Sequence, residues 1–288
     1  MKFKSTRITV LSSLILLLVL QPAVVSGFDL GLDSLKDMAK KIKHASGKVP
    51  VEEEIRIGDS VCAQLLGAAP LVQQKSLQHY VNSVGMWVAQ QTDRKQLPWA
   101  FGVIDSDNIN AFATPGGRVL VTRGLFVTLE SEAELAGVLG HEVAHVIRKH
   151  HLKALKKNAR MDLLGDALQV VAEDHGIKDQ EKLDALINAG TQLYARGLDR
   201  ADEFEADRLG IIYAGRAGYD PFALLNVLAT LDSINPDSPK LALLNKTHPS
   251  FNDRIAQLDR SIGNRLDRYA RQPQLVERLL QIKRQILP

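Results

Sequence analysis

The spacing of apolar and polar residues changes abruptly part-way along the chain. Residues 51–66 and 71–91 both repeat apolar positions every three to four residues, which predicts two amphipathic helices. Three short runs follow at residues 99–104, 110–113 and 118–122, and turn-forming Asn, Asp, Pro and Gly separate them. Runs this short and this closely spaced predict a small antiparallel sheet.

Helical periodicity returns directly after these strands. Ser131 and Glu134 have the spacing of a capping box, and apolar residues from Leu135 to Ile147 continue at helical intervals. Further helices are predicted at residues 161–172, 181–196, 199–214 and 221–231 and over the charged tail at 251–286. The sequence shows no internal repeat and no low-complexity linker. It therefore predicts an α+β fold, mainly α-helical, with the small sheet placed before the helix that starts near Ser131.

The start of the chain combines three features of a secretory signal peptide. The first seven residues carry basic side chains and no acidic one, residues 8–20 are apolar, and Val25, Ser26 and Gly27 are small enough for cleavage. An uncleaved membrane anchor is the alternative, but the apolar run is shorter than the roughly 20 residues that a spanning helix needs. We therefore expect residues 1–27 to be a signal peptide, cleaved near Gly27, and the protein to be exported.

A helical extension is predicted over residues 28–75, between the cleavage site and the main domain. Within it, residues 30–45 form an amphipathic basic stretch, which suits a solvated helix or, alternatively, a membrane surface. The main domain is then expected to cover residues 76–288. A chain of this length can form one large domain or a core domain with extensions.

Charge and cysteine content exclude two classes of protein. The chain has 36 basic and 33 acidic residues, and the signal segment alone carries Lys2, Lys4 and Arg7, so the remainder has 33 of each. Such a balance gives no electrostatic reason to expect nucleic-acid binding. Cys62 is the single cysteine, so a disulfide-stabilised scaffold is excluded, and Cys62 is expected to be a small buried apolar residue.

The strongest chemical signal is the sequence His-Glu-Val-Ala-His at residues 141–145. On a helix, side chains four residues apart lie one above the other, so His141 and His145 can reach the same metal ion. Neutral imidazole binds zinc well, and Glu142 is then placed as the general base for a water molecule. A catalytic zinc site needs three protein ligands and an open position, so a third ligand must lie elsewhere.

The best candidate for that third ligand lies in the acidic helix predicted at residues 199–214. Glu203 and Asp207 are four residues apart and share one helical face, so Glu203 can bind the metal while Asp207 accepts a hydrogen bond from a ligand histidine. Glu205 is the alternative on the other face, and a solvated acidic face is the alternative without a metal. Residues 149–157 are strongly basic, and we expect a solvated helix end there with His150 and His151 exposed.

Together with two further motifs, these residues resemble peptidase family M-48. The motifs are Thr-His-Pro-Ser at residues 247–250, followed by Arg254, and the stretch 110–117 before the metal helix. The family includes the CAAX prenyl proteases, the membrane protease HtpX and periplasmic quality-control proteases. No membrane-spanning segments flank the His-Glu-x-x-His motif, so the resemblance implies the soluble periplasmic type with a zincin-like metallopeptidase domain.

The resemblance implies a role for each candidate residue. His141, His145 and Glu203 would hold one Zn²⁺ per chain, and Glu142 would be the catalytic base. His248 or Arg254 would stabilise the oxyanion of the reacting carbonyl. An alternative for His248 is that it occupies the open position of the zinc and keeps the enzyme latent.

Substrates and partners follow from the same reasoning. The strand at Asn110, Ala111, Phe112 and Ala113 could bind an extended peptide by edge addition, with loose sequence specificity. The leading hypothesis is a periplasmic zinc endopeptidase that acts on misfolded or envelope proteins, including outer-membrane partners, with no cofactor beyond zinc. The alternative is a chaperone-like or latent protein-binding module whose zinc site is structural or self-blocked. A hydrolase of a non-peptide substrate is weaker, because nothing indicates phosphate or nucleotide binding.

Overall fold

The computed structural model describes residues 49–155, 157, 197–269 and 271–286. The chain divides into two compact units, Met1–Lys43 and His44–Pro288, and the first lies outside the described residues. The predicted signal peptide and the helices predicted at residues 30–45, 161–172 and 181–196 also lie outside them. Within the described ranges, no helix is long and apolar enough to cross a membrane.

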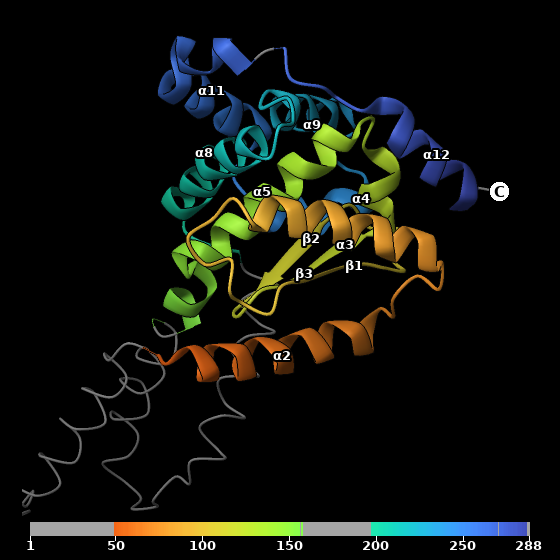
Figure 1. The fold of residues 1–288 in the computed structure, drawn as a ribbon, viewed down its shortest axis with the longest axis vertical. Coiled ribbons are helices and arrows are strands. Elements are labelled where there is room, and N and C mark those ends of the chain that lie inside the picture. Colours follow the sequence, from red (N-terminus) through yellow and green to blue (C-terminus); the bar gives the residue numbers. More distant parts are fainter. Residues whose placement is uncertain (1–48, 156, 158–196, 270, 287–288) are drawn as a thin grey trace, which may run out of the picture. The chain divides into compact units, whose positions relative to one another are not determined.

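A three-stranded sheet lies between helices on its two faces (Figure 1). The strands β1 (Ala100–Ile104), β2 (Ala111–Thr114) and β3 (Arg118–Thr122) have the order β1-β3-β2. Pairing is antiparallel between β2 and β3 but parallel between β1 and β3, so the antiparallel prediction holds for one of the two pairs. Each turn reverses the chain, and β3 rather than β2 lies beside β1, so these two strands run in the same direction.

Successive side chains of the strands point to opposite faces of the sheet and so divide the core into two layers. In β3, Val119 and Val121 join the main core, whereas Leu120 joins a smaller cluster with Cys62. The smaller cluster packs between the sheet and α2 (Val51–Ala68). The main core packs between the sheet, α3 (Lys75–Ala89) and helices later in the chain. Because successive side chains of a strand point to opposite faces, both faces of this sheet are covered by helices (Figure 1). Cys62 is buried, as predicted.

The helix α5 (Glu132–Arg148) runs through the centre of the domain and is buried over nearly its whole length. Its start confirms the predicted N-cap, since the Ser131 hydroxyl accepts a hydrogen bond from the backbone N–H of Glu134 at 3.1 Å. The Glu134 carboxylate accepts from the N–H of Glu130 at 2.6 Å, one residue earlier than in the usual capping box. The helix ends at Lys149, whose φ of 58° is left-handed.

Two glycines let α5 cross α8 (Arg200–Arg216) at backbone contact. A Cβ atom on Gly140 would lie 2.7 Å from the Gly210 carbonyl oxygen, and one on Gly210 would lie 2.7 Å from the backbone nitrogen of His141. These separations are shorter than any van der Waals contact, so a side chain at either position would force the helices apart. The crossing therefore places residues of α8 directly beside the His-Glu-x-x-His motif.

The other helices that the structure describes complete this part of the chain. They are α4 (Arg123–Thr128), η1 (Pro239–Leu241), α9 (Ala223–Ser233), α10 (Ala242–Thr247), α11 (Phe251–Ile262), η2 (Gly263–Tyr269) and α12 (Val276–Ile286). The tail, predicted as helical over residues 251–286, is interrupted. Helix α11 stops at Gly263, which has a φ of 51° that favours glycine.

The carboxylate of Glu54 ties α2 to the end of α5. It accepts two hydrogen bonds from Arg94, at 2.8 and 3.0 Å, and lies 2.7 Å from the ammonium group of Lys149. Burial alone would raise the pKa of Glu54, but Arg94 and Lys149 outweigh it and the pKa is lowered. Since Arg94 also donates to the Val146 carbonyl at 3.1 Å, the cluster anchors the last turn of the helix that carries the two histidines.

Replacing Glu54 with Gln is expected to lower the free energy of unfolding by about 1–3 kcal/mol near neutral pH, because two cations lose a charged acceptor. A depressed carboxyl pKa stabilises the fold above the unfolded-state value of about 4.3, and this contribution is lost as pH falls through the folded-state pKa. The difference between the two proteins should therefore shrink below about pH 4.3 in urea titrations. The exposed pair Arg118–Asp59 provides the control, where Asp59→Asn should cost less than about 1 kcal/mol. Equal losses for both variants would contradict the prediction.

Candidate metal centre

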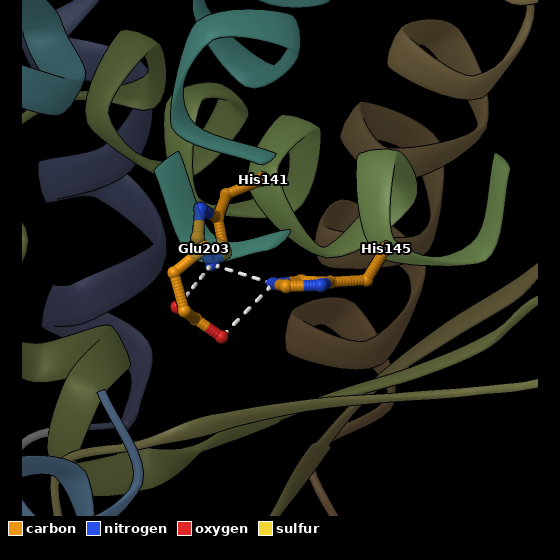
Figure 2. Close-up of side chains that lie close together, drawn as sticks. All are labelled: His141, His145 and Glu203. Atoms are coloured by element: carbon orange, nitrogen blue, oxygen red, sulfur yellow. Dashed lines mark hydrogen bonds and ion pairs between the residues drawn. The ribbon is translucent and has the colours of Figure 1, made fainter. Parts of the chain in front are cut away.

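His141 and His145 project from the same side of α5 into the protein interior (Figure 2). Their spacing of four residues brings the two rings together edge to face, with an interplanar angle of 77°, and their Nε2 atoms lie 3.0 Å apart. Both side chains are buried, and burial lowers the pKa of His141 and lowers that of His145 well below its ordinary value. Both imidazoles are therefore neutral at physiological pH, the form that binds a metal ion.

Glu203 comes from the first turn of α8 and faces both rings (Figure 2). Its Oε2 lies 3.6 Å from Nε2 of His141, and its Oε1 lies 3.6 Å from Nε2 of His145. Burial raises the pKa of Glu203 well above its ordinary value. Among the described side chains, Oε2 of Glu203 is one of a few buried polar atoms that have no hydrogen-bond partner.

These three side chains fit a zinc ion. The two Nε2 atoms lie 3.0 Å apart, and each lies 3.6 Å from an oxygen of Glu203, separations that a central ion at about 2.0–2.2 Å from each ligand atom can bridge. Two neutral imidazoles and one carboxylate form a donor set that zinc favours. A divalent cation at this point would also stabilise the carboxylate form of Glu203, which burial alone disfavours.

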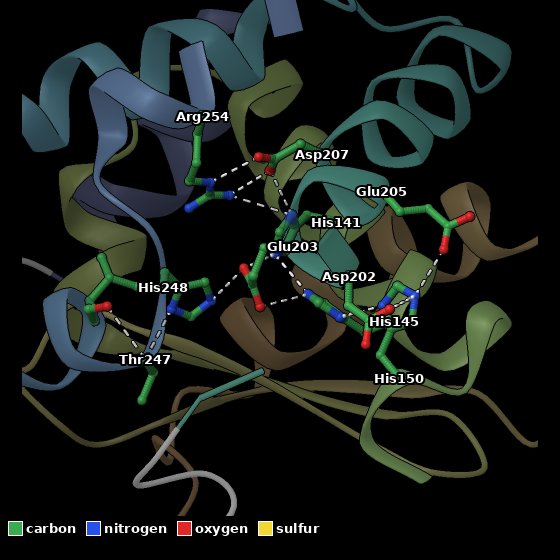
Figure 3. A network of polar contacts seen from close by, with 11 residues as sticks. His141, His145, His150, Asp202, Glu203, Glu205, Asp207, Thr247, His248 and Arg254 are labelled. Atoms are coloured by element: carbon green, nitrogen blue, oxygen red, sulfur yellow. Dashed lines mark hydrogen bonds and ion pairs between the residues drawn. The ribbon is translucent and has the colours of Figure 1, made fainter. Parts of the chain in front are cut away.

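Asp207 and Arg254 lie behind His141 (Figure 3). Oδ1 of Asp207 is 2.8 Å from Nδ1 of His141, and Nε of Arg254 donates to Oδ2 of Asp207 at 2.9 Å. Burial alone would raise the pKa of Asp207, but the charge and hydrogen bonds of Arg254 outweigh it and hold the pKa well below its usual range. Asp207 is therefore a carboxylate, and it meets the His141 ring directly.

Glu142 lines a small, partly open cavity that His145 also lines. The cavity has a volume of about 30 Å³, enough for a water molecule, and its wall includes Asn110, Ala111, Phe112, Glu203 and His248. Burial raises the pKa of Glu142 to about 8, and Arg254 partly opposes that rise. The cavity thus brings a carboxylate of high proton affinity next to the three converging side chains.

His248 reaches the same cavity from the end of α10, whereas Arg254 does not line it. The Nε2 atom of His248 lies 3.5 Å from Oε2 of Glu203, and its Nδ1 lies 2.9 Å from the Thr247 hydroxyl. Burial lowers the pKa of His248 well below its ordinary value, so this ring is neutral as well. Of the two residues that the sequence proposed for the oxyanion, His248 therefore lines the cavity and Arg254 does not.

His150 and His151 are buried, so the prediction that they are exposed is wrong. The left-handed turn at Lys149 redirects the chain, and residues 150–155 form a second helical segment. Leu152 and Leu155 of that segment pack against Ile57 of α2. The two leucines, three residues apart, were the sequence signal for a buried face, and the surrounding basic residues concealed it.

The fold and the converging side chains define a class of protein, a metallopeptidase domain built around a His-Glu-x-x-His helix. The family model for Peptidase family M48 matches residues 75–262. This chain belongs to peptidase family M48.

Three relatives illustrate how far the similarity extends. The chain is 33% identical over 244 residues to the beta-barrel assembly-enhancing protease of Escherichia coli (strain K12), which covers 81% of this chain and 48% of that protein. It is 30% identical over 255 residues to the protein of that name from Yersinia pestis, with 86% and 51% covered. It is 32% identical over 180 residues to the mitochondrial metalloendopeptidase OMA1 of Bos taurus, with 59% and 34% covered. The chain thus spans about half the length of the two bacterial relatives and 34% of the length of the mitochondrial one.

Proposed function

We propose that this chain is a zinc-dependent endopeptidase, with one Zn²⁺ held by His141, His145 and Glu203. The observation that carries the proposal is the buried Glu203 carboxylate, which faces two neutral imidazoles while its Oε2 accepts no hydrogen bond. Burying a carboxylate in this way is costly unless a cation compensates it. Membership of peptidase family M48 supports the same reading.

The reaction is peptide-bond hydrolysis, and Glu142 moves the proton. Bound zinc would act as a Lewis acid, which acidifies water and polarises the scissile carbonyl. Glu142 accepts a proton from water as the oxygen–carbon bond forms, and returns it to the nitrogen as the carbon–nitrogen bond breaks. Burial strengthens Glu142 as a base by raising its pKa. A bound zinc ion would oppose that rise and keep the carboxylate ionised before it accepts the proton.

We propose that His248 stabilises the developing oxyanion and that Arg254 acts through Asp207. His248 lines the cavity, whereas Arg254 is hydrogen-bonded to Asp207 behind His141. For His248 to donate from Nε2, its Nδ1 must accept the Thr247 hydroxyl proton across their 2.9 Å contact. The other tautomer leaves a lone pair on Nε2, directed at the site.

A second candidate is a latent or chaperone-like protein-binding module, in which His248 closes the zinc site or the zinc is structural. The Thr247 hydroxyl favours this reading, because it donates to the Leu243 carbonyl at 2.8 Å. A hydroxyl has one proton, so its oxygen is then the acceptor for Nδ1 of His248. That arrangement leaves Nε2 of His248 as a lone pair 3.5 Å from Glu203, suited to bind the metal.

We further propose that the substrates are proteins of the bacterial envelope, including misfolded ones. The name of the Escherichia coli relative, a beta-barrel assembly-enhancing protease, supports an envelope setting. Residues 110–113 would contact an extended substrate, since β2 is the outer strand of the described sheet and Asn110, Ala111 and Phe112 line the cavity. A signal peptide over residues 1–27, a helical extension over 28–75, a peptidase domain over 76–288 and a periplasmic location remain part of this proposal.

Metal removal tests the proposal and separates the two candidates. The full chain is expected to contain one zinc per molecule and to degrade casein. It should lose both the zinc and the activity on chelation and regain both with stoichiometric zinc.

In the same casein assay, His248→Ala should reduce the rate by about 10- to 1000-fold if His248 stabilises the oxyanion. A faster rate in that variant would favour the latent form. Proteolysis that survives complete zinc removal would contradict the zinc-dependent mechanism.

A further inference from the structure

The two candidate ligand histidines differ in what lies behind them. Nδ1 of His141 meets the carboxylate of Asp207 directly, at 2.8 Å. Nδ1 of His145 instead meets a second imidazole, that of His150, whose Nδ1 lies 2.9 Å away (Figure 3). His150 is fully buried, and the proposed mechanism assigns it no role.

The protons in this contact have one consistent arrangement when His145 binds a metal through Nε2. The proton of the neutral His145 ring is then on Nδ1, which donates to Nδ1 of His150. The proton of the neutral His150 ring is consequently on Nε2, which donates to Oε2 of Glu205 at 3.1 Å. Oδ1 of Asp202 lies beside it at 3.4 Å. Each of the four ring nitrogens then has one partner: the metal, the other ring or Glu205.

The hydrogen bonds behind His145 end at a carboxylate paired with an arginine, as do those behind His141. Glu205 is paired with the guanidinium of Arg148 at 2.9 Å, as Asp207 is paired with Arg254. Both ligand histidines are thus connected to a carboxylate that an arginine holds, directly for His141 and through one more imidazole for His145. Partners of this kind orient a ligand ring, select its tautomer and strengthen its basicity.

The backbone fixes His150 independently of the hydrogen bonds. The left-handed Lys149 ends α5, and the Lys149 side chain is paired with the buried Glu54. The following helical segment is held by Leu152 and Leu155, which pack against Ile57. His150 therefore contacts the His145 ring from a helical segment that is packed against α2.

We propose that His150 is a positioning residue that holds the His145 ring in the orientation and tautomer required to bind zinc. The inference depends on the proposed function, because it requires zinc at His141, His145 and Glu203. Glu205 completes the arrangement by accepting the outer proton of His150. His150 touches neither the ion nor the substrate.

The same residues also allow a different reading, a second cation site. Ligand atoms of His150, Asp202 and Glu205 lie within 4.8 Å of one another. Glu205 is already paired with a guanidinium, however, and the proton on Nε2 of His150 points at Glu205. A cation there would compete with Arg148 and displace that proton, so the positioning role agrees better with the contacts.

An isosteric pair of variants tests the inference in the full chain. His150→Asn keeps an oxygen acceptor near the position of Nδ1, whereas His150→Leu has the same size and no acceptor. The zinc dissociation constant, measured by chelator competition, should rise about 10- to 100-fold for His150→Leu and much less for His150→Asn. In the zinc-loaded proteins, the proton resonance of the His145 ring N–H should persist in His150→Asn and be lost in His150→Leu, while that of His141 persists in both.

Glu205→Leu provides a second variant, because Glu205 is partly exposed and its replacement leaves the core intact. It should weaken zinc binding more than Glu205→Gln, which still accepts a proton from His150. Unchanged zinc affinity in both leucine variants, with wild-type protein binding zinc, would overturn the positioning role alone. Two zinc ions per wild-type chain, with only the second lost in His150→Leu, would overturn it in favour of a cation site. A wild-type chain without zinc would remove the proposed function, and the inference with it.

Discussion

Replacing Glu142 with Gln is expected to reduce kcat/KM for casein by about 10²- to 10⁴-fold, the contribution typical of a general acid–base group. Gln has the same size and remains able to form hydrogen bonds, but its amide cannot take a proton from water. Glu142 lines the cavity beside Glu203 and His248 and is not one of the three converging ligands. Zinc content and the thermal unfolding midpoint should therefore stay close to those of the wild-type chain.

The matched control is Glu134→Gln, in the first turn of the same helix. Glu134 is also buried, but its carboxylate accepts a hydrogen bond from the backbone N–H of Glu130, which an amide oxygen can equally accept. This variant should keep its proteolytic rate within a few-fold of wild type. Casein degradation and metal analysis of both variants are the measurements. A Glu142→Gln protein with full zinc and an undiminished rate would exclude Glu142 as the base.

Replacing Arg254 with Leu is expected to lower the free energy of unfolding by about 3–5 kcal/mol, since removing one partner strands a buried charge. The stranded group is Asp207, whose carboxylate Arg254 binds through two nitrogens. The expected result is a lower urea midpoint with an unchanged slope. Zinc binding should weaken too, because Asp207 would no longer be held against His141.

Two controls separate the charge from the lost packing. Combining Arg254→Leu with Asp207→Asn removes the stranded charge and should restore part of the lost stability, a coupling that a double-mutant cycle measures. The exposed pair Arg200–Asp253 joins the same two helices, α8 and α11, and Arg200→Leu should cost less than about 1 kcal/mol. Equal costs for Arg200→Leu and Arg254→Leu would contradict the assignment.

Local patterns predicted most of the secondary structure around the site. The capping residue Ser131, the helical stripe after it and the four-residue spacing of His141 and His145 all act within one helix. Their geometry follows from the period of the helix, so no distant contact was needed. Glu203 and Asp207 were predicted in the same way, as one face of a second helix.

Predictions that depended on distant contacts were less successful. Whether β1 pairs with β2 or β3 determines the direction of pairing, and strand spacing in the sequence does not contain that choice. His150 and His151 lie in a basic stretch typical of a solvated surface, yet Ile57, from far earlier in the chain, covers the segment. That His248 lines the cavity while Arg254 is hydrogen-bonded to Asp207 likewise depends on how distant helices pack together.

By itself, the sequence determined a helix with two histidines and a glutamate close together, a second helix with Glu203 and Asp207 on one face, and a family resemblance that the comparisons confirmed. Helical spacing is a property of neighbouring residues, so these features are encoded locally. Only the tertiary structure decided that Gly140 and Gly210 bring the helices together, that Glu203 meets both rings, and that His150 stands behind His145. These contacts join residues far apart in the sequence. They form only where the packing of distant helices lets their backbones come close together.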